Sequence, residues 1–294
     1  MTAASPDTSQ RHWRGNLAVC MAGSFTTIVA MTLLLPFLPL YVEQLGVSDH
    51  AAIVQWSGVA FGATFFTAAL VAPLWGRLAD VYGRKLMLIR ASLGMAVAMA
   101  LIGLAHNVWQ LVALRLLAGL LGGYASGSMV LVATQTPKDR TGWALGTLSA
   151  AIMAGNLAGP LAGGWLPPLI GIRNTFFAAG GLIFLSFLAT LFLIREEHRP
   201  AAARATQGGG DWGDIPDRRP VIAMLLTGAL LALANMSIEH IITVYVAQLV
   251  PEPGRVTQVA GLVMAAAALG SILSSSYLGR LADRVGHWRV IIGC

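Results

Sequence analysis

Charge is what this chain has least of. Only 11% of its 294 residues are Asp, Glu, Lys or Arg, whereas 56% are hydrophobic. A soluble domain with this composition would have too few polar residues to cover its surface. It has two cysteines, Cys20 and Cys294, and they give neither a disulfide framework nor the Cys/His spacing of a metal site. A phosphate-binding loop and a paired nucleophile and base are absent too. We therefore expect no enzyme, no cofactor and no bound metal.

Long apolar runs fill most of the chain instead. A segment that crosses a bilayer core about 30 Å thick needs roughly 20 apolar residues. Such a segment must be a helix or part of a closed barrel, because lipid offers no hydrogen bonds to the backbone. The alternation that barrel strands require is missing. We predict an all-α integral membrane protein, with spans at about 17–41, 54–75, 86–105, 108–132, 143–168, 174–194, 221–249 and 256–278, and a ninth beginning near Arg289.

The basic residues follow a regular order along the chain. Although the net charge is +6, these residues do not gather on one domain, so a nucleic-acid partner is not expected. They lie before the first span and in every second loop, while the loops between carry almost none. By the positive-inside rule, this alternation predicts a multi-pass protein with a cytoplasmic amino terminus.

One loop differs from the others in composition. The segment 195–220 is rich in charge, glycine and proline, and predicts a flexible cytoplasmic linker. It divides the chain into a six-helix bundle (1–194) and a second, incomplete bundle (221–294) with two helices and the start of a third.

A short motif occurs once in each half, about 200 residues apart. Parallel repeats of membrane helices are typical of secondary transporters. In the first copy we expect glycines to permit a tight turn, Asp80 to cap a helix and the basic pair to bind acids or lipid phosphates. A generic basic loop would explain the cations but not the glycines, the acid or the second copy. The two copies are Gly76, Arg77, Asp80, Gly83, Arg84 and Lys85, and Gly279, Asp283 and Gly286.

The fifth predicted span carries a strip of glycines. Gly155, Gly159 and Gly163 recur at helical spacing, beside Pro160 and Gly164. Such a strip lets another helix approach closely, and we expect its partner in the eighth span, at Ala266, Gly270 and Ser274. Generic membrane packing is the alternative.

Ionisable residues inside apolar runs mark candidate functional positions. Arg115 lies within the fourth span, where a charge is costly unless it faces the protein interior, a cavity or, by snorkelling, the headgroups. Glu239 and His240 lie in the seventh span, where burial would raise a carboxyl pKa far enough for proton uptake. A hydrated Glu239 at the end of a cavity is the alternative. These three residues are candidates for proton coupling.

Taken together, these motifs resemble the drug:proton antiporter group of the major facilitator superfamily, including its bacterial multidrug exporters. The segment 35–46, LPFLPLYVEQLG, adds to the likeness. The resemblance implies a monomeric twelve-helix carrier of the bacterial inner membrane that exports small amphipathic molecules in exchange for protons. It makes the Asp80 loop a gate, Arg115 a proton-transfer residue and Gly155–Gly164 an antiporter motif. It also implies that the chain is truncated at its carboxyl end.

Two other functions remain open at this stage. A facilitator or symporter of a sugar or organic anion would share the fold and the repeated loop. A truncated product that transports nothing would share them as well.

Overall fold

The computed structural model describes residues 12–196, 219–250, 252 and 255–285. The regular elements in these ranges are helices, as the sequence predicts. Their bounds are α1 Trp13–Thr32, α2 Leu38–Gln44, α3 His50–Tyr82, α4 Arg84–Gly103, α5 Val108–Leu121, α6 Tyr124–Gln135, α7 Thr141–Ile170, α8 Ile172–Leu193, α9 Arg219–Leu249 and α10 Val256–Val285.

Each of the first eight predicted spans coincides with helix, whereas the start of the ninth, near Arg289, lies outside the described residues. Within the described residues, seven helical segments are long and apolar enough to cross a membrane, and α9 is helical where the seventh span was expected. Two predicted spans are each divided into two helices. The first breaks between α1 and α2, around Pro36, and the fourth breaks between α5 and α6, at Gly122 and Gly123.

Local chemistry sets several of the helix ends. The side chain of Asp49 accepts a hydrogen bond from the Ala52 amide at 2.8 Å and caps α3. Asn107 caps α5 in the same way. Gly83 and Gly171 have positive φ angles of 92° and 85°, so each lets one helix end and the next begin almost at once.

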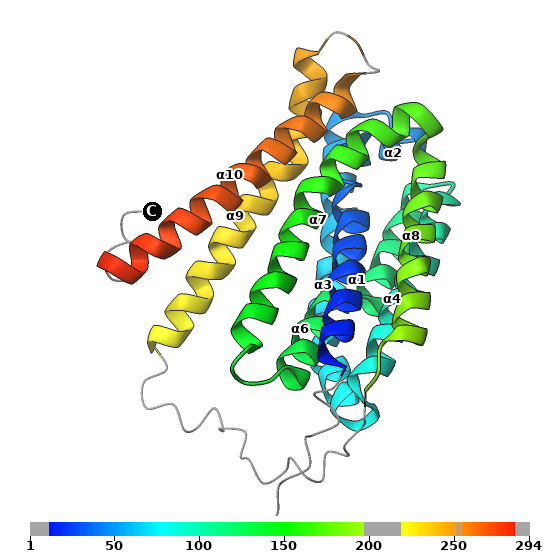
Figure 1. Cartoon of the computed structure of the whole chain (residues 1–294). Coiled ribbons are helices and arrows are strands. Elements are labelled where there is room, and N and C mark those ends of the chain that lie inside the picture. The colour runs from blue at the N-terminus through cyan, green and yellow to red at the C-terminus, as the bar shows by residue number, and fades with distance from the viewer. Residues whose placement is uncertain (1–11, 197–218, 251, 253–254, 286–294) are drawn as a thin grey trace, which may run out of the picture.

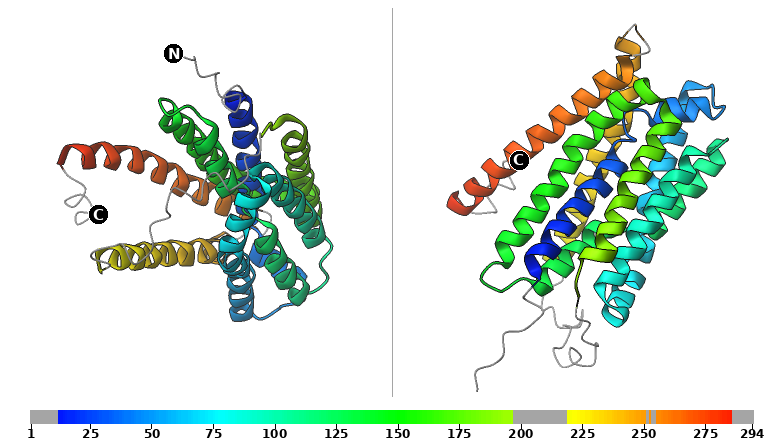
Figure 2. Two further views of the ribbon diagram at one scale, coloured as in Figure 1. Left: turned by 90° about the horizontal axis from the view of Figure 1, so that it is seen from below. Right: turned by 45° about the vertical axis from the view of Figure 1, so that its right-hand side comes forward.

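The first eight helices form one bundle, and α9 and α10 lie against one side of it. In the bundle α1 packs against α7 and α8, α4 packs against α8, and α3 packs against α5. α10 follows α7, and α9 touches α3. Figures 1 and 2 show that α9 and α10 meet the bundle near the turn that joins them and diverge from it towards their other ends.

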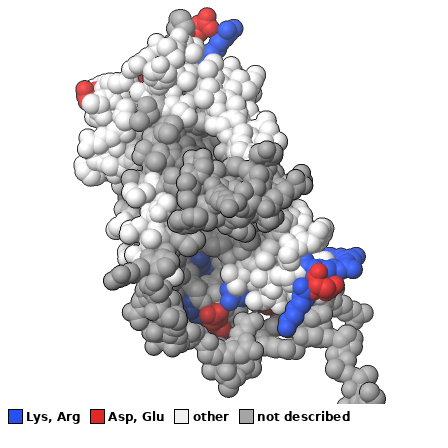
Figure 3. Space-filling model, turned by 90° about the vertical axis from the view of Figure 1, so that its left-hand side faces the viewer, with Lys and Arg blue, Asp and Glu red and all other residues white. Residues whose placement is uncertain are grey.

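Charged residues distinguish the two ends of the molecule from its middle. Figure 3 shows charged side chains gathered towards both ends, with an uncharged described surface between them. We call the end that carries Arg84, Lys138 and Arg140 the basic end. The other, which carries Asp49 and the α9–α10 turn with Glu252, we call the opposite end.

Residues at both edges of the predicted linker are hydrogen-bonded or helical. Arg195 and Glu196 are hydrogen-bonded to the first bundle, and α9 already begins at Arg219. The segment between, 197–218, lies outside the described residues, as does Gly286 of the second motif copy.

Candidate functional site

Arg115 is a fully buried cation between α3 and α5. No part of the residue is exposed. Its Nε donates to the carbonyl of Ala60 at 3.4 Å, and its guanidinium carbon lies 5.8 Å from the centre of the Phe61 ring. Both terminal nitrogens lack a hydrogen-bond partner among the described residues. The side chain therefore faces the protein interior and does not snorkel to the membrane surface.

Two threonines hold the turn of α5 that carries Arg115. Thr64 donates to the Arg115 carbonyl at 3.0 Å, and Thr67 donates to the Leu116 carbonyl at 2.9 Å. A Cβ on Gly119 would overlap the Thr64 carbonyl oxygen, so only glycine permits this approach. The sequence interpretation missed these threonines. Their signal is a pair of hydroxyls three residues apart in an otherwise apolar run.

The break between α5 and α6 is closed by an arginine and a tryptophan. Arg90 of α4 donates to the carbonyls of Leu120 and Gly122 at 3.3 and 3.0 Å, and Trp75 donates to Leu120 at 2.9 Å. The Arg90 guanidinium stacks 3.6 Å from the Trp75 ring. The carbonyls at the end of α5 lack helical partners, and these side chains supply them.

The Asp80 motif is mostly helical, contrary to expectation. α3 continues through Gly76 to Tyr82, and the turn consists of Gly83 alone. A Cβ on Gly76 would meet nothing within 4 Å, so Gly83 is the motif glycine that the turn requires. Asp80 does not cap a helix. Its carboxylate pairs with the Arg84 guanidinium at 2.7 Å across the turn.

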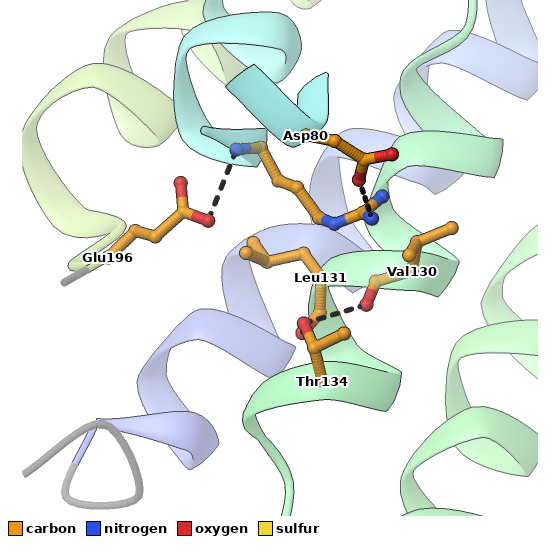
Figure 4. Close-up of polar contacts among 6 residues, drawn as sticks. Asp80, Val130, Leu131, Thr134 and Glu196 are labelled. Carbon is orange, nitrogen blue, oxygen red and sulfur yellow. Dashed lines mark hydrogen bonds and ion pairs between the residues drawn. The ribbon is translucent and has the colours of Figure 1, made fainter. Parts of the chain in front are cut away.

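The cap that was expected from Asp80 is supplied by Glu196. Its two carboxylate oxygens accept hydrogen bonds from the backbone amides of Arg84 and Lys85, at 3.1 and 2.6 Å. Figure 4 shows Glu196 reaching from the end of α8 to the first turn of α4, beside the Asp80 pair. An anion at a helix amino terminus satisfies free N–H groups and the helix dipole. The segment after α8 therefore stabilises the Asp80 turn.

A second contact fixes the same segment on its other side. The buried Asn16 amide receives a hydrogen bond from the Arg195 amide at 3.0 Å and donates to the Arg195 carbonyl at 2.7 Å. It also donates to Gln135 at the end of α6. At the basic end the chain leaving α8 is thus bonded to α1 and α4.

The glycine strip of α7 is buried, but its partner is not the predicted one. A Cβ on Gly155 would meet Ile28, and one on Gly159 or Gly163 would overlap Thr32 or Leu33, so these glycines face α1. The expected partner strip is wrong, since Gly270 has open space around it and Ala266 and Ser274 are exposed.

α10 does reach α7, on the face of the helix beside that strip. A Cβ on Gly164 would lie 2.8 Å from the Thr257 carbonyl oxygen, and one on Gly261 would overlap the Pro160 carbonyl. Pro160 and Gly164 of the motif thus face the second half of the chain, while its other glycines face α1.

The remaining candidates cannot be placed in the site. Glu239 and His240 lie in α9, and Gly279 and Asp283 lie in α10, at positions where the structure describes the helix but not the side chains. Their predicted roles therefore stay predictions. In the described part of the chain, no group of His, Cys, Asp and Glu could hold a metal ion.

Comparison with known proteins places the fold. The sequence model of the Major Facilitator Superfamily matches residues 20–294. The chain belongs to this superfamily. It is 42% identical over 282 residues to the multidrug resistance protein MdtG of Klebsiella pneumoniae (strain 342), covering 96% of this chain and 68% of that protein. It is 41% identical over 289 residues to MdtG of Salmonella arizonae, covering 98% of this chain and 72% of that protein.

Solved structures of the superfamily share the fold. The D-xylose-proton symporter superposes with a TM-score of 0.60 at 14% identity, covering 93% of this chain and 70% of that one. The nucleoside transporter NupG gives a TM-score of 0.61 at 13% identity, covering 91% and 68%. The resemblance inferred from the motifs is confirmed. This is a multi-pass membrane protein of a transporter superfamily, similar to MdtG multidrug resistance proteins.

Proposed function

We propose that the protein exports small amphipathic drugs or metabolites across the bacterial inner membrane in exchange for protons. The drug-efflux part rests on the similarity to MdtG proteins, which extends over nearly the whole chain. The proton-coupling part rests on one observation: Arg115 is fully buried, and its two terminal nitrogens have no partner among the described residues.

A cation in that position is unfavourable unless an anion meets it at some stage of transport. Burying an unpaired charge costs roughly several kcal/mol. A conformation that brings a carboxylate to the guanidinium is therefore stabilised. Proton uptake by that carboxylate removes the attraction and releases the pair. We propose that this exchange couples proton entry to substrate release, with Glu239 as the candidate acid and His240 beside it.

Proton entry can supply enough free energy to drive export of the substrate. One proton moving inward across 100 mV releases about 2.3 kcal/mol. At about 1.4 kcal/mol per tenfold, this sustains roughly a fiftyfold gradient of a neutral substrate. We propose that the basic end is cytoplasmic, because basic residues gather on the cytoplasmic side of membrane proteins. The substrate would then leave at the opposite end.

We further propose the division into a first bundle (1–194), a linker (195–220) and part of a second bundle (221–294), acting as a monomer. Residues 195 and 196 would serve as the anchored start of the linker. In this arrangement the Asp80 turn is the basic-end gate, and its counterpart in α10 is the matching turn of the second half.

Transport by the purified protein in proteoliposomes tests the proposal. With an imposed pH gradient, efflux of a fluorescent amphipathic cation should be abolished by a protonophore. Arg115→Met should lower proton-driven efflux at least about tenfold, the factor that corresponds to about 1.4 kcal/mol. Arg173→Met is the matched control, because Arg173 is exposed at the opposite end, and it should stay within about twofold of the parent. Full protonophore-sensitive efflux by Arg115→Met would refute the assignment.

Other results would favour the other functions. Transport that a protonophore does not affect indicates a facilitator, and protons moving with the substrate indicate a symporter. A folded protein that moves nothing indicates a non-transporting chain. Unchanged pH dependence in Glu239→Gln would exclude Glu239 as the coupling acid.

A further inference from the structure

Two backbone carbonyls of the first bundle, those of Gly164 and Leu35, lack a helical partner. In an α-helix each carbonyl accepts from the amide four residues later. Pro168 of α7 has no N–H for the carbonyl of Gly164. Leu35 lies in the break between α1 and α2, outside both helices, so its carbonyl has no helical partner either. A carbonyl left unpaired within a membrane is strongly unfavourable. Each needs another donor.

The second half of the chain supplies both donors. Thr257 of α10 donates its hydroxyl to the Gly164 carbonyl at 3.1 Å, and Thr243 of α9 donates to the Leu35 carbonyl at 3.3 Å. The two threonines are only 4% and 1% exposed. They therefore form two hydrogen bonds that join the halves and that water does not reach.

Close backbone packing surrounds one of these bonds. Gly261 of α10 sits against the Pro160 carbonyl and Gly164, with no room for a Cβ on either glycine. The pattern is different towards the basic end. There Gly228 of α9 and Gly270 of α10 have nothing within 4 Å, and the ribbons separate (Figure 1). The halves are joined at the opposite end and parted towards the basic end.

We propose that the hydroxyls of Thr243 and Thr257 hold the opposite end closed, each by pairing with a carbonyl of the first bundle that has no helical partner. For a transporter to open that end, both hydroxyls must leave the two carbonyls. The bonds thus bias the equilibrium towards the conformation seen here. The net worth of one such bond corresponds to about a fivefold change in that equilibrium. This follows from the transporter fold and does not depend on proton coupling.

Distance measurement between spin labels tests the proposal in the whole chain, without substrate or pH gradient. Labels on Leu169→Cys and Glu252→Cys, both exposed at the opposite end, report its opening after both native cysteines are replaced by alanine. Thr243→Val and Thr257→Val should each raise the population at long distance about fivefold, and the double variant roughly 25-fold.

Two kinds of control separate the hydroxyl from general damage. Thr243→Ser and Thr257→Ser keep the hydroxyl and should give the parent distribution. Thr227 lies on α9 too, but its exposed hydroxyl donates only to Ala223 of its own helix, at 2.8 Å. Thr227→Val should therefore change nothing. Valine variants that match the parent would overturn the proposal.

Restoring the missing amide gives an independent check. In Pro168→Ala, residue 168 regains an N–H for the Gly164 carbonyl, so the Thr257 hydroxyl becomes redundant. Adding Thr257→Val to Pro168→Ala should then shift the distances less than about twofold. A shift of the original size in this background would show that the hydroxyl bond is not the cause, and would overturn the proposal for Thr257. Because no transport is measured, failure of the proton-coupled function would leave these results unaffected.

Discussion

Replacing Gly163 by alanine probes how tightly α7 rests on α1. The added Cβ would lie 2.7 Å from the Leu33 carbonyl carbon and 3.0 Å from its Cα, with the carbonyl oxygen nearer still. Ordinary contact begins at 3.4 Å, so one helix must move by about 0.7 Å or more. The obstacle is backbone and cannot rotate away. Overpacking of this kind costs about 1–3 kcal/mol.

A smaller opposing effect comes from the helix itself. Alanine is more favourable than glycine inside a helix by about 0.5–1 kcal/mol. We therefore expect Gly163→Ala to lower the free energy of unfolding by about 1–2 kcal/mol. Gly146 is the matched control, because it lies in the same helix and has nothing within 4 Å. Gly146→Ala should raise the free energy of unfolding by about 0.5–1 kcal/mol.

Equilibrium unfolding in mixed detergent micelles, followed by tryptophan fluorescence, measures both changes. The two variants should change the free energy of unfolding in opposite directions, so the test does not depend on its absolute value. If Gly163→Ala proves as stable as Gly146→Ala, the close approach of α7 to Leu33 is wrong. The same result would remove the physical reason for glycine at this position of the α7 strip.

Two further predictions concern the contacts around the basic end. Glu196→Ala should lower the free energy of unfolding by about 1–2 kcal/mol, because the first amides of α4 lose their acceptor. The control is Glu252→Ala at an exposed residue, which should change the free energy of unfolding by under about 0.5 kcal/mol. Equal effects of the two variants in the same unfolding assay would contradict the cap. Arg90→Met should speed amide hydrogen exchange at the α5–α6 break about tenfold, because the Gly122 carbonyl loses its donor and the Leu120 carbonyl keeps only Trp75. Unchanged exchange, measured by mass spectrometry, would show that Arg90 does not hold the break.

The membrane helices were predictable because their signal is local. A run of about 20 apolar residues is sufficient to identify a span, whatever it packs against. Asp49 and Asn107 cap helices within a few residues of themselves, and the glycine spacing in α7 indicates close packing without naming the neighbour. Each of these features depends on residues near in sequence.

The missed features depend on residues far apart in sequence. Nothing near Asp80 indicates that Glu196, 111 residues beyond Lys85, caps α4. The glycines of α7 fit α1 as well as α10 by composition, so the prediction chose α10 without a signal that could exclude α1, and it was wrong. Gly122 and Gly123 interrupt a helix only because Arg90 and Trp75 satisfy the carbonyls that the break exposes.

The halves meet differently at the two ends of the molecule. At the opposite end, threonines of α9 and α10 bond to carbonyls of the first bundle. At the basic end, Asp80 is paired with Arg84 of its own turn, and no hydrogen bond or ion pair joins it to the described parts of α9 or α10. The Glu196 cap keeps that turn in shape while the second half is away. In the cycle that we propose, closing the basic end would therefore require no refolding of the turn. It would require only that the second half approach the turn, after the two threonine bonds at the opposite end have broken.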